Sequence, residues 1–296
     1  MEEIVNLNGS LVPRSKALIS VFDHAFLYGY GLYETFRAYN GQFFLLDRHI
    51  RRLLESAETI GLGKKLADID FEKACRETLD ANGLESARTR ITVSNGASDA
   101  APWTSPTDIQ PNVVVTTRPF MPFPAEKYGE GFHLGMAPTI RRCRQSLITT
   151  MKTINHLDSV IARMQAAARG LDEALILNDD GYIAEGGGCN IFFVREGRLT
   201  TPALNSGILP GITREVVMEL AAGLGIETSQ GPVGIGIIRK CDEAFMTNAV
   251  IEIMPVTEVR DESGNSVTIS GGKAGEITQK LMEVYRKKVE KETGKK

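Results

Sequence analysis

The 296-residue chain lacks the residue patterns of several protein classes. No apolar run approaches the roughly 18 residues of a membrane helix. The opening MEEIVNLNGSLVPR is acidic and turn-rich, where a signal peptide needs a basic flank and then an apolar stretch. The four cysteines form no C-x-x-C pair, and the four histidines are scattered. We therefore expect a cytoplasmic protein without a metal site or a disulfide scaffold.

A strong charge of one sign is also missing. The chain has 34 Lys and Arg against 37 Asp and Glu, a net charge of -3, and no basic block. We therefore expect neither nucleic acid nor a membrane as partner, but a small molecule. P-loop, H-E-x-x-H and G-x-S-x-G motifs are absent, and GIGIIR at 234–239 has only two glycines of a dinucleotide fingerprint. We interpret that segment as a loop.

What the chain does have is length for about two domains of roughly 150 residues and an ordinary composition, 42% hydrophobic and 24% charged. Three prolines within residues 119–124 favour an extended segment. We predict a small α+β domain over residues 1–118, a linker over 119–128, and a larger domain over 129–296. The expected class is α/β (α+β).

Local signals predict the elements of both domains. Asn-Gly pairs at 8–9 and 40–41 predict two hairpins. Apolar periodicity between an aspartate and a glycine predicts helices from Asp47 to Gly61 and from Asp70 to Gly83. Further helices are predicted over 155–170, over 213–225 with a Thr213 cap, and over 273–291 with a frayed basic end. Strands are predicted over 88–94, 112–117, 173–178, 190–194 and 243–248.

Five segments are richer in polar residues and glycine than a core would be: 20–37, 149–159, 183–193, 207–215 and 245–256. In this order they resemble the class IV, or fold type IV, pyridoxal-phosphate aminotransferases. That family includes branched-chain aminotransferases, D-amino-acid aminotransferases and 4-amino-4-deoxychorismate lyases. The resemblance covers residues from about 4 to about 285. It implies a homodimer with shared active sites and two domains with pyridoxal 5'-phosphate between them.

The resemblance implies which residues hold the cofactor. Lys152, in TTMKTINHL, takes the Schiff-base position, where a partly desolvated amine is nucleophile and then proton shuttle. A lysine taken at random is a solvated surface charge, so the motif carries this assignment. Glu185, opening EGGGCN, matches the carboxylate that keeps the pyridine nitrogen protonated. Gly186–Gly188 would let the backbone approach the cofactor. Arg52 would come from the first domain to meet Lys152 and Glu185 of the second.

The cofactor phosphate needs hydrogen-bond donors. The resemblance assigns it the backbone N–H groups of Ile212 and Thr213, at a helix N-terminus. An ordinary threonine cap is the alternative. Arg52 matches the arginine that clamps the phosphate. On a helical wheel Arg52 lies nearly opposite the apolar stripe, which also suits a solvated face, and Arg48 and Arg51 are rivals.

Two aromatic positions resemble the branched-chain group. Tyr28, from the other subunit of the dimer, and Tyr33 match residues that line the substrate pocket, although core tyrosines are the alternative. GGKAGEITQKL and LPGITRE also resemble that group. His156 stands where many relatives carry the tyrosine that bonds the cofactor's 3-oxygen, so that contact is open.

Other positions resemble the lyases. Thr35 in YETFR stands where branched-chain enzymes have glycine, and Arg88-Thr89-Arg90 replaces their Tyr-x-Arg. MTNAV replaces their Thr-Ala turn, with Asn248 assigned to the cofactor and Ala249 to the substrate. Thr35, Arg88 and Arg90 are further substrate candidates, since arginine pairs with carboxylates through two hydrogen bonds. A charged strand face in solvent is the alternative for both arginines.

We therefore predict a transaminase that moves an amino group from an L-amino acid, branched-chain favoured, to 2-oxoglutarate through Lys152. Its partners are a small amino acid and a 2-oxo acid. The alternative is a 4-amino-4-deoxychorismate lyase that releases pyruvate and 4-aminobenzoate. A non-catalytic ligand-binding protein is a third possibility, which the presence of Lys152 and Glu185 disfavours. The D-amino-acid branch is disfavoured because its Arg-x-His carboxylate trap aligns with Ala100-Ala101-Pro102.

Overall fold

The computed structural model describes residues 2–104 and 109–294, which form two compact units. The first unit contains the described residues up to Met121, the segment Met151–Asn155, and the residues from Val289 onward. The second contains Pro122–Thr150 and His156–Lys288. The chain therefore leaves the first unit after Met121 and returns to it twice.

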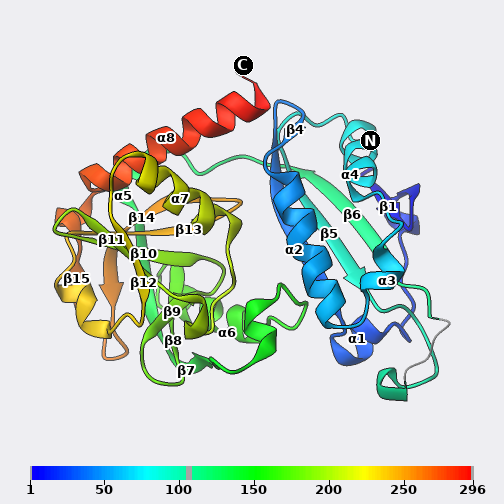
Figure 1. Ribbon diagram of the computed structural model, residues 1–296, viewed down its shortest axis with the longest axis horizontal. Helices are drawn as coiled ribbons and strands as arrows, with labels where there is room; N and C mark the ends of the chain where they lie inside the picture. The colour runs from blue at the N-terminus through cyan, green and yellow to red at the C-terminus, as the bar shows by residue number, and fades with distance from the viewer. Residues whose placement is uncertain (1, 105–108, 295–296) are drawn as a thin grey trace. The chain divides into compact units, whose positions relative to one another are not determined.

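The first unit is built on a six-stranded antiparallel sheet with the order β2-β1-β6-β5-β3-β4 (Figure 1). Its strands are β1 (Ile4–Leu7), β2 (Ser10–Pro13), β3 (Gly31–Tyr39), β4 (Gln42–Phe43), β5 (Ala87–Ser94) and β6 (Asn112–Pro119). Its helices are α1 (His24–Tyr28), α2 (Leu46–Thr59), α3 (Gly63–Leu66) and α4 (Phe71–Ala81). Helix α2 packs on β3, and α4 packs on β6 and β1.

Both predicted hairpins are confirmed. β1 pairs with β2, and β3 pairs with β4. Asn8 and Gly9 have φ of 52° and 83°, and Asn40 and Gly41 have φ of 50° and 72°. Such turns need positive φ at both central residues, which asparagine and glycine tolerate best.

The two predicted helices of this unit are also confirmed, and α2 begins one residue before Asp47. The Asp70 side chain accepts a hydrogen bond from the Lys73 backbone N–H at 2.9 Å and so caps α4. The core lies between these helices and one face of the sheet. Its strand residues, 0–4% exposed, are Leu32, Phe36, Ile91, Val93, Val113 and Val115.

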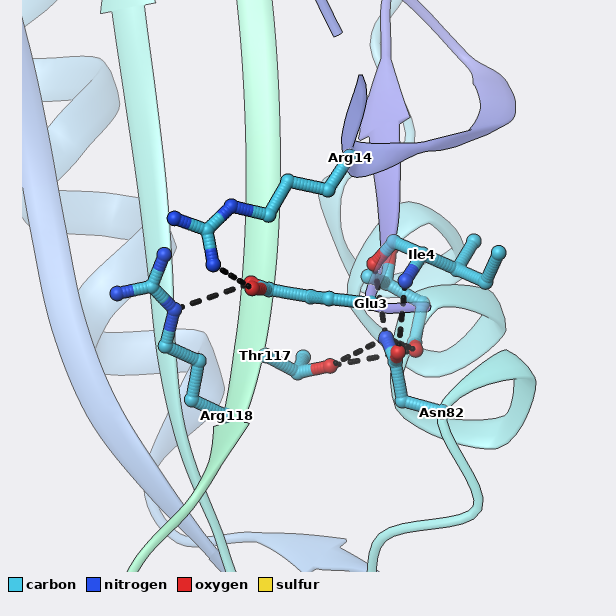
Figure 2. A network of polar contacts seen from close by, with 7 residues as sticks. Glu3, Ile4, Arg14, Asn82, Thr117 and Arg118 are labelled. Carbon is cyan, nitrogen blue, oxygen red and sulfur yellow. Dashed lines mark hydrogen bonds and ion pairs between the residues drawn. The ribbon is translucent and has the colours of Figure 1, made fainter. Parts of the chain in front are cut away.

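Polar contacts fix the first strand to its neighbours, as Figure 2 shows. The Glu3 carboxylate pairs with Arg118 Nε at 3.0 Å and Arg14 Nη1 at 3.4 Å. The Asn82 side chain accepts from the Ile4 N–H and donates to the Ile4 carbonyl, each at 2.8 Å. Its amide also donates to Thr117 Oγ1 at 3.0 Å. The end of α4 is therefore tied to the strands beneath it.

The second unit holds a nine-stranded mixed sheet with the order β12-β11-β10-β13-β14-β7-β8-β9, and β15 pairs with β14 (Figure 1). The strands are β7 (Phe132–Arg142), β8 (Glu173–Asn178), β9 (Ile183–Gly186), β10 (Asn190–Arg195), β11 (Arg198–Pro202), β12 (Thr228–Gly231), β13 (Glu243–Asn248), β14 (Glu252–Arg260) and β15 (Ser266–Thr268). The α-helices that begin in this unit are α5 (Ala125–Glu130), α6 (Leu157–Ala167), α7 (Ile212–Gly223) and α8 (Glu276–Thr293). No helix in residues 2–104 and 109–294 has the length and apolar character needed to cross a membrane.

The predicted linker over 119–128 is wrong in part. Strand β6 extends to Pro119, and helix α5 begins at Ala125. Only the residues between them are an irregular connection. Pro124 is the N-cap of α5, a place where proline's missing N–H costs nothing, so this proline starts a helix as well as ending a loop.

The predicted Thr213 cap is also wrong, because α7 begins at Ile212 with Gly211 as its N-cap. A Cβ added at Gly211 would lie 1.9 Å from Asn190 Oδ1. The first turn therefore packs too closely against β10 for a side chain at the cap.

The expected frayed end of the last helix is wrong as well. Helix α8 continues to Thr293, and Val289 and Thr293 are only 5% and 3% exposed. The Asn40 side-chain amide donates to the Gly294 carbonyl at 2.7 Å. Packing against the first unit's own residues orders this segment despite its charge. Lys295 and Lys296 lie outside the described residues.

Candidate active site

Lys152 belongs to the first unit, whereas the sequence placed it in the second domain. Met151–Asn155 pairs with the beginning of β3. The Tyr33 N–H donates to the Lys152 carbonyl at 2.9 Å, and the Ile154 N–H donates to the Gly31 carbonyl at 3.1 Å. Strand β4 pairs only with the far end of β3, so this edge would otherwise carry unpaired backbone groups.

The Lys152 side chain lies among residues that were predicted to bind substrate. Its Nζ is 4.5 Å from the centre of the Tyr33 ring, and the Arg90 guanidinium carbon is 3.8 Å from that centre. Burial lowers the pKa of Arg90, partly offset by Tyr33. Arg90 Nε also donates to Thr92 Oγ1 at 3.0 Å. The structure therefore gathers an amine, a phenol ring and a guanidinium in one cluster.

The register of β3 and β5 places the other predicted substrate residues of these strands on one face of the sheet. Thr35 lies opposite Arg90, and Arg37 lies opposite Arg88, so all project from the face that α2 and α4 do not cover. Thr35 Oγ1 is buried and has no hydrogen-bond partner among residues 2–104 and 109–294. Arg88 is exposed and Arg90 half-buried, so a solvated charged strand describes only Arg88.

Arg52 pairs with a carboxylate that the sequence analysis did not single out. Its Nε and Nη2 each donate to the Glu34 carboxylate at 2.8 Å. His49 Nδ1 lies 2.8 Å from Glu34 Oε2. The alternative of a solvated face does not hold, because the Arg52 side chain is 12% exposed. Arg51, one residue earlier, is the exposed one.

The charges of this group follow from its partners. Burial alone would raise the pKa of Glu34, but the Arg52 charge and the hydrogen bonds from His49 and Arg52 hold it at about 2. Burial lowers the pKa of His49 against the opposing effect of Glu34, and the charges of Arg52 and Lys152 lower it further. Glu34 is therefore ionised and His49 neutral near pH 7. The Lys152 amine lies within electrostatic range of this imidazole.

Tyr28 is placed elsewhere in the first unit. It ends α1, is 47% exposed, and makes edge contacts with the His24 and Trp103 rings at 5.4 and 5.7 Å between centroids. These contacts do not join it to the Tyr33 cluster. Its assignment to a partner subunit's pocket stays a prediction.

In the second unit, Glu185 lies in β9, where its carboxylate has an ion pair with Arg142 and a hydrogen bond from the backbone. Arg142 Nε lies 3.0 Å from one carboxylate oxygen, and the Leu209 N–H donates to the other at 3.1 Å. Arg142 Nη2 donates to Ser159 Oγ at 2.7 Å. Arg142 belongs to none of the motifs, and its only signal in the sequence is the arginine-rich end of its strand. The ion pair and the Leu209 hydrogen bond fix the orientation of the Glu185 carboxylate.

Packing restricts the first two of the three glycines after Glu185. A Cβ at Gly186 would lie 2.9 Å from Met246 Cε, and one at Gly187 would lie 2.4 Å from Arg163 Cγ. At Gly188 the nearest atom would be 3.8 Å away. We expected all three glycines to let a cofactor approach the backbone. At Gly186 and Gly187, packing against neighbouring side chains is a second explanation.

Glu173 lies beside this turn. It is 2% exposed, and its carboxylate lies 3.2 Å from Arg163 Nε. It also accepts the Ala174 N–H at 2.8 Å. Burial raises the pKa of Glu173 despite the opposing Arg163 charge and backbone hydrogen bonds.

The beginning of α7 offers donors to an anion. Ile212 and Thr213 are buried, and the first N–H groups of a helix have no carbonyl partner within it. Because Gly211 brings no side chain to cap them, the helix dipole and these groups together favour a negatively charged ligand.

Asn248 uses its side chain to hold a turn. Its amide donates to the Gly188 carbonyl at 3.0 Å and contacts Cys189 Sγ at 3.1 Å. Its oxygen accepts the Val250 and Ile251 N–H groups at 2.8 and 2.9 Å. The turn after β13, which includes Ala249, is thus fixed beside the glycine-rich turn.

His156 is the N-cap of α6.

Comparison with known proteins identifies the family. Residues 31–259 match the family described as "Amino-transferase class IV". A Methanocaldococcus jannaschii protein, provisionally named a branched-chain-amino-acid aminotransferase, is 36% identical over 95% of each chain. The aminodeoxychorismate lyase of Bacillus subtilis (strain 168) is 32% identical over 97% of this chain and 94% of its own.

A solved structure extends the similarity to the fold. The T.th. branched-chain amino acid aminotransferase, complexed with N-(5'-phosphopyridoxyl)-L-glutamate, matches with a TM-score of 0.85 at 31% identity. The match covers 100% of this chain and 96% of that chain. The chain therefore belongs to the class IV aminotransferase family and has its fold type IV architecture.

Proposed function

We propose that this enzyme is a transaminase that uses pyridoxal 5'-phosphate to move an amino group from a branched-chain L-amino acid to 2-oxoglutarate. The observation that carries the proposal is the Lys152 amine, held over the Tyr33 ring beside Arg90. The similarity to branched-chain aminotransferases supports the substrate class.

The residues present fit this cofactor. An aldehyde needs an amine, which Lys152 offers, and a pyridine nitrogen needs a fixed carboxylate, which Glu185 offers through its contacts with Arg142 and Leu209. A phosphate needs donors and positive charge; the start of α7 in the second unit would offer the donors, and Arg52 in the first unit would offer the charge. When bound, the cofactor supplies an electron sink for the substrate Cα.

Each residue then has a definite task. Lys152 holds the cofactor through its amine and moves the proton at the substrate Cα. Glu185 keeps the ring nitrogen protonated. In the second unit the backbone N–H groups of Ile212 and Thr213 would donate to the phosphate, and in the first unit the Arg52 guanidinium would pair with it. Asn248 serves the cofactor by holding the turn beside Gly188.

The substrate would meet the polar face of β3 and β5. Arg90 and Arg88 would attract the second carboxylate of 2-oxoglutarate, and Tyr33 would line the pocket. Thr35 Oγ1 is buried without a partner in the described part of the chain, and it would donate to the substrate. Ala249 would contribute to the substrate site from the turn after β13. We propose a homodimer in which the partner copy's Tyr28 completes the pocket.

A 4-amino-4-deoxychorismate lyase is the second candidate. Thr35 and the Arg88-Thr89-Arg90 run favour it, as does the 32% identity with the lyase of Bacillus subtilis. The same Lys152 would then serve elimination of pyruvate to leave 4-aminobenzoate.

Visible absorbance tests the cofactor assignment. We expect the purified protein to develop a visible band with pyridoxal phosphate, and Lys152→Ala to lose it. Lys73→Ala, which removes an exposed lysine of α4, should keep it. A sample that stays colourless, or a Lys152→Ala variant with the wild-type band, would contradict the proposal.

Substrate assays then separate the two reactions. Valine, leucine or isoleucine with 2-oxoglutarate should yield glutamate. Release of pyruvate from aminodeoxychorismate, without glutamate in the first assay, would select the lyase. Sedimentation should show a dimer. A monomer would contradict the proposal that the partner copy completes the pocket.

A further inference from the structure

Glu34 has no task in the proposed chemistry, yet it is 0% exposed and lies in the middle of β3. Its carboxylate has three close partners: His49 Nδ1, Arg52 Nε and Arg52 Nη2, each at 2.8 Å. An ion buried in this way must be compensated by its neighbours, so these contacts fix all three side chains together.

The Glu34–Arg52 pair has the two-pronged geometry that only a guanidinium can form. Glu34 takes the edge of the guanidinium that carries Nε. Because the group is planar, this contact also fixes the direction of the opposite edge, which carries Nη1. An arginine on an isolated helix would sample many rotamers, and holding it in one costs conformational entropy before any ligand is bound.

We infer that Glu34 is the positioning residue of Arg52: it fixes the guanidinium in the orientation that binds the cofactor phosphate. The inference rests on the proposed function, since it needs Arg52 to bind that phosphate. His49 shares the task by donating to the same carboxylate and so holding it toward Arg52.

The direction in which phosphate binding changes when Glu34 is removed distinguishes a positioning role from a simple effect of charge. Glu34 carries a negative charge next to Arg52, so its removal by itself would increase the attraction for an anion. If Glu34 orients Arg52, its removal weakens phosphate binding instead. The two explanations therefore predict changes in opposite directions.

Glu34→Gln is a suitable variant because the fold can accommodate it. The introduced amide oxygen can accept one hydrogen bond from Arg52, and the amide nitrogen can donate to His49. His49 is neutral and can accept through Nδ1 after a change of tautomer. The change therefore removes the charge and the two-pronged contact without leaving an empty space.

The experiment measures Kd by visible absorbance for pyridoxal phosphate and for pyridoxal, which lacks the phosphate. In Glu34→Gln we expect the Kd for pyridoxal phosphate to rise about 10-fold, with the Kd for pyridoxal unchanged. Arg52→Gln should do the same, and the double variant should lose little more, because both changes remove one interaction.

Two further variants show whether a change in Kd is specific to the position of the Glu34 carboxylate. Glu34→Asp keeps the charge but withdraws the carboxylate by one methylene, so it should also raise the Kd for pyridoxal phosphate. Glu243→Gln is the matched control, because Glu243 is a buried carboxylate of the second unit that caps α8 through the Ile277 and Thr278 N–H groups. It should leave the ratio of the two Kd values unchanged.

The outcomes are distinct. A Kd for pyridoxal phosphate that falls or stays constant in Glu34→Gln and Glu34→Asp overturns the inference. Equal rises for both ligands also overturn it, since that is the result of general loosening. If the wild-type protein forms no visible band with either ligand, the proposed function fails instead.

Discussion

Two buried carboxylates, one in each unit, show opposite behaviour with similar partners. Glu34 is 0% exposed and pairs with Arg52, and Glu173 is 2% exposed and pairs with Arg163. Burial alone would raise both pKa values. The pKa of Glu34 is nevertheless held at about 2, whereas that of Glu173 stays raised.

Two differences separate the carboxylates: Glu34 also has a hydrogen bond with His49, and the two arginines differ in exposure and distance. Arg52 is 12% exposed and gives two hydrogen bonds at 2.8 Å, whereas Arg163 is 59% exposed and has one contact at 3.2 Å. A charge in water is screened, and its attraction for a buried partner falls accordingly. A buried carboxylate is thus stabilised as an ion only when its partner is enclosed with it.

The largest test of this comparison removes each arginine in turn. Arg52→Ala should destabilise the cofactor-free protein by about 3 kcal/mol, because it leaves a buried charge without its main partner. Arg163→Ala should cost less than about 1 kcal/mol. Urea unfolding at pH 7 measures both. Equal losses would mean that enclosure of the partner does not matter.

The pH dependence of Glu34 is the second test. Its pKa is about 2 in the folded protein against 4.5 as the ordinary value, so its contribution is present above pH 4.5 and is lost as pH falls toward 2. The stability advantage of the wild type over Glu34→Gln should therefore shrink by about 3 kcal/mol between pH 5 and pH 2. Urea midpoints across this range check it, and a flat difference would contradict it.

Glu173 should change the free energy of unfolding less steeply with pH than Glu34 does, and in the opposite direction. Because its pKa is raised in the folded protein, the contribution of its protonated form is present below the ordinary value of 4.5 and is lost as pH rises through the folded pKa. Relative to the wild type, Glu173→Gln should become more stable as pH rises. Parallel curves for Glu173→Gln and Glu34→Gln would break the comparison.

The smallest effect concerns the glycines beside Glu173. Gly187→Ala would push Arg163 aside and weaken its pairing with Glu173, at a cost of about 1 kcal/mol. Gly188→Ala has its nearest atom at 3.8 Å and should change stability by less than about 0.5 kcal/mol. Thermal unfolding of the two variants at pH 7 compares them. The reverse order would place the steric constraint at Gly188.

Local structure was predictable where one short segment contains the whole cause. The Asn8-Gly9 and Asn40-Gly41 turns follow from the conformations that these residues tolerate, and the Asp70 cap follows from its oxygen three residues before Lys73. The prediction of a Thr213 cap was wrong because α7 begins earlier, with Gly211 as its N-cap. Position 211 has space only for glycine, because Asn190, far away in sequence, lies against it.

The candidate site was predictable as a set of chemical groups but not as an arrangement. Motifs were sufficient to select Lys152, Tyr33 and Arg90, which the structure does bring together. The helical wheel left Arg52 open between a solvated face and the cofactor, because a wheel cannot show that Glu34 on β3 lies within hydrogen-bond distance of it.

The sequence alone determined the turns, the approximate positions of the five longest helices, the presence of about two units and the family, because each of these depends on neighbouring residues or on ordered motifs. Only the tertiary structure decided that Lys152 pairs with the free edge of β3 and that the charged end of α8 is ordered. It also decided that Glu34 is ionised and Glu173 resists ionisation. These outcomes depend on which distant groups share a buried space, and burial and partner distance are properties of the folded chain.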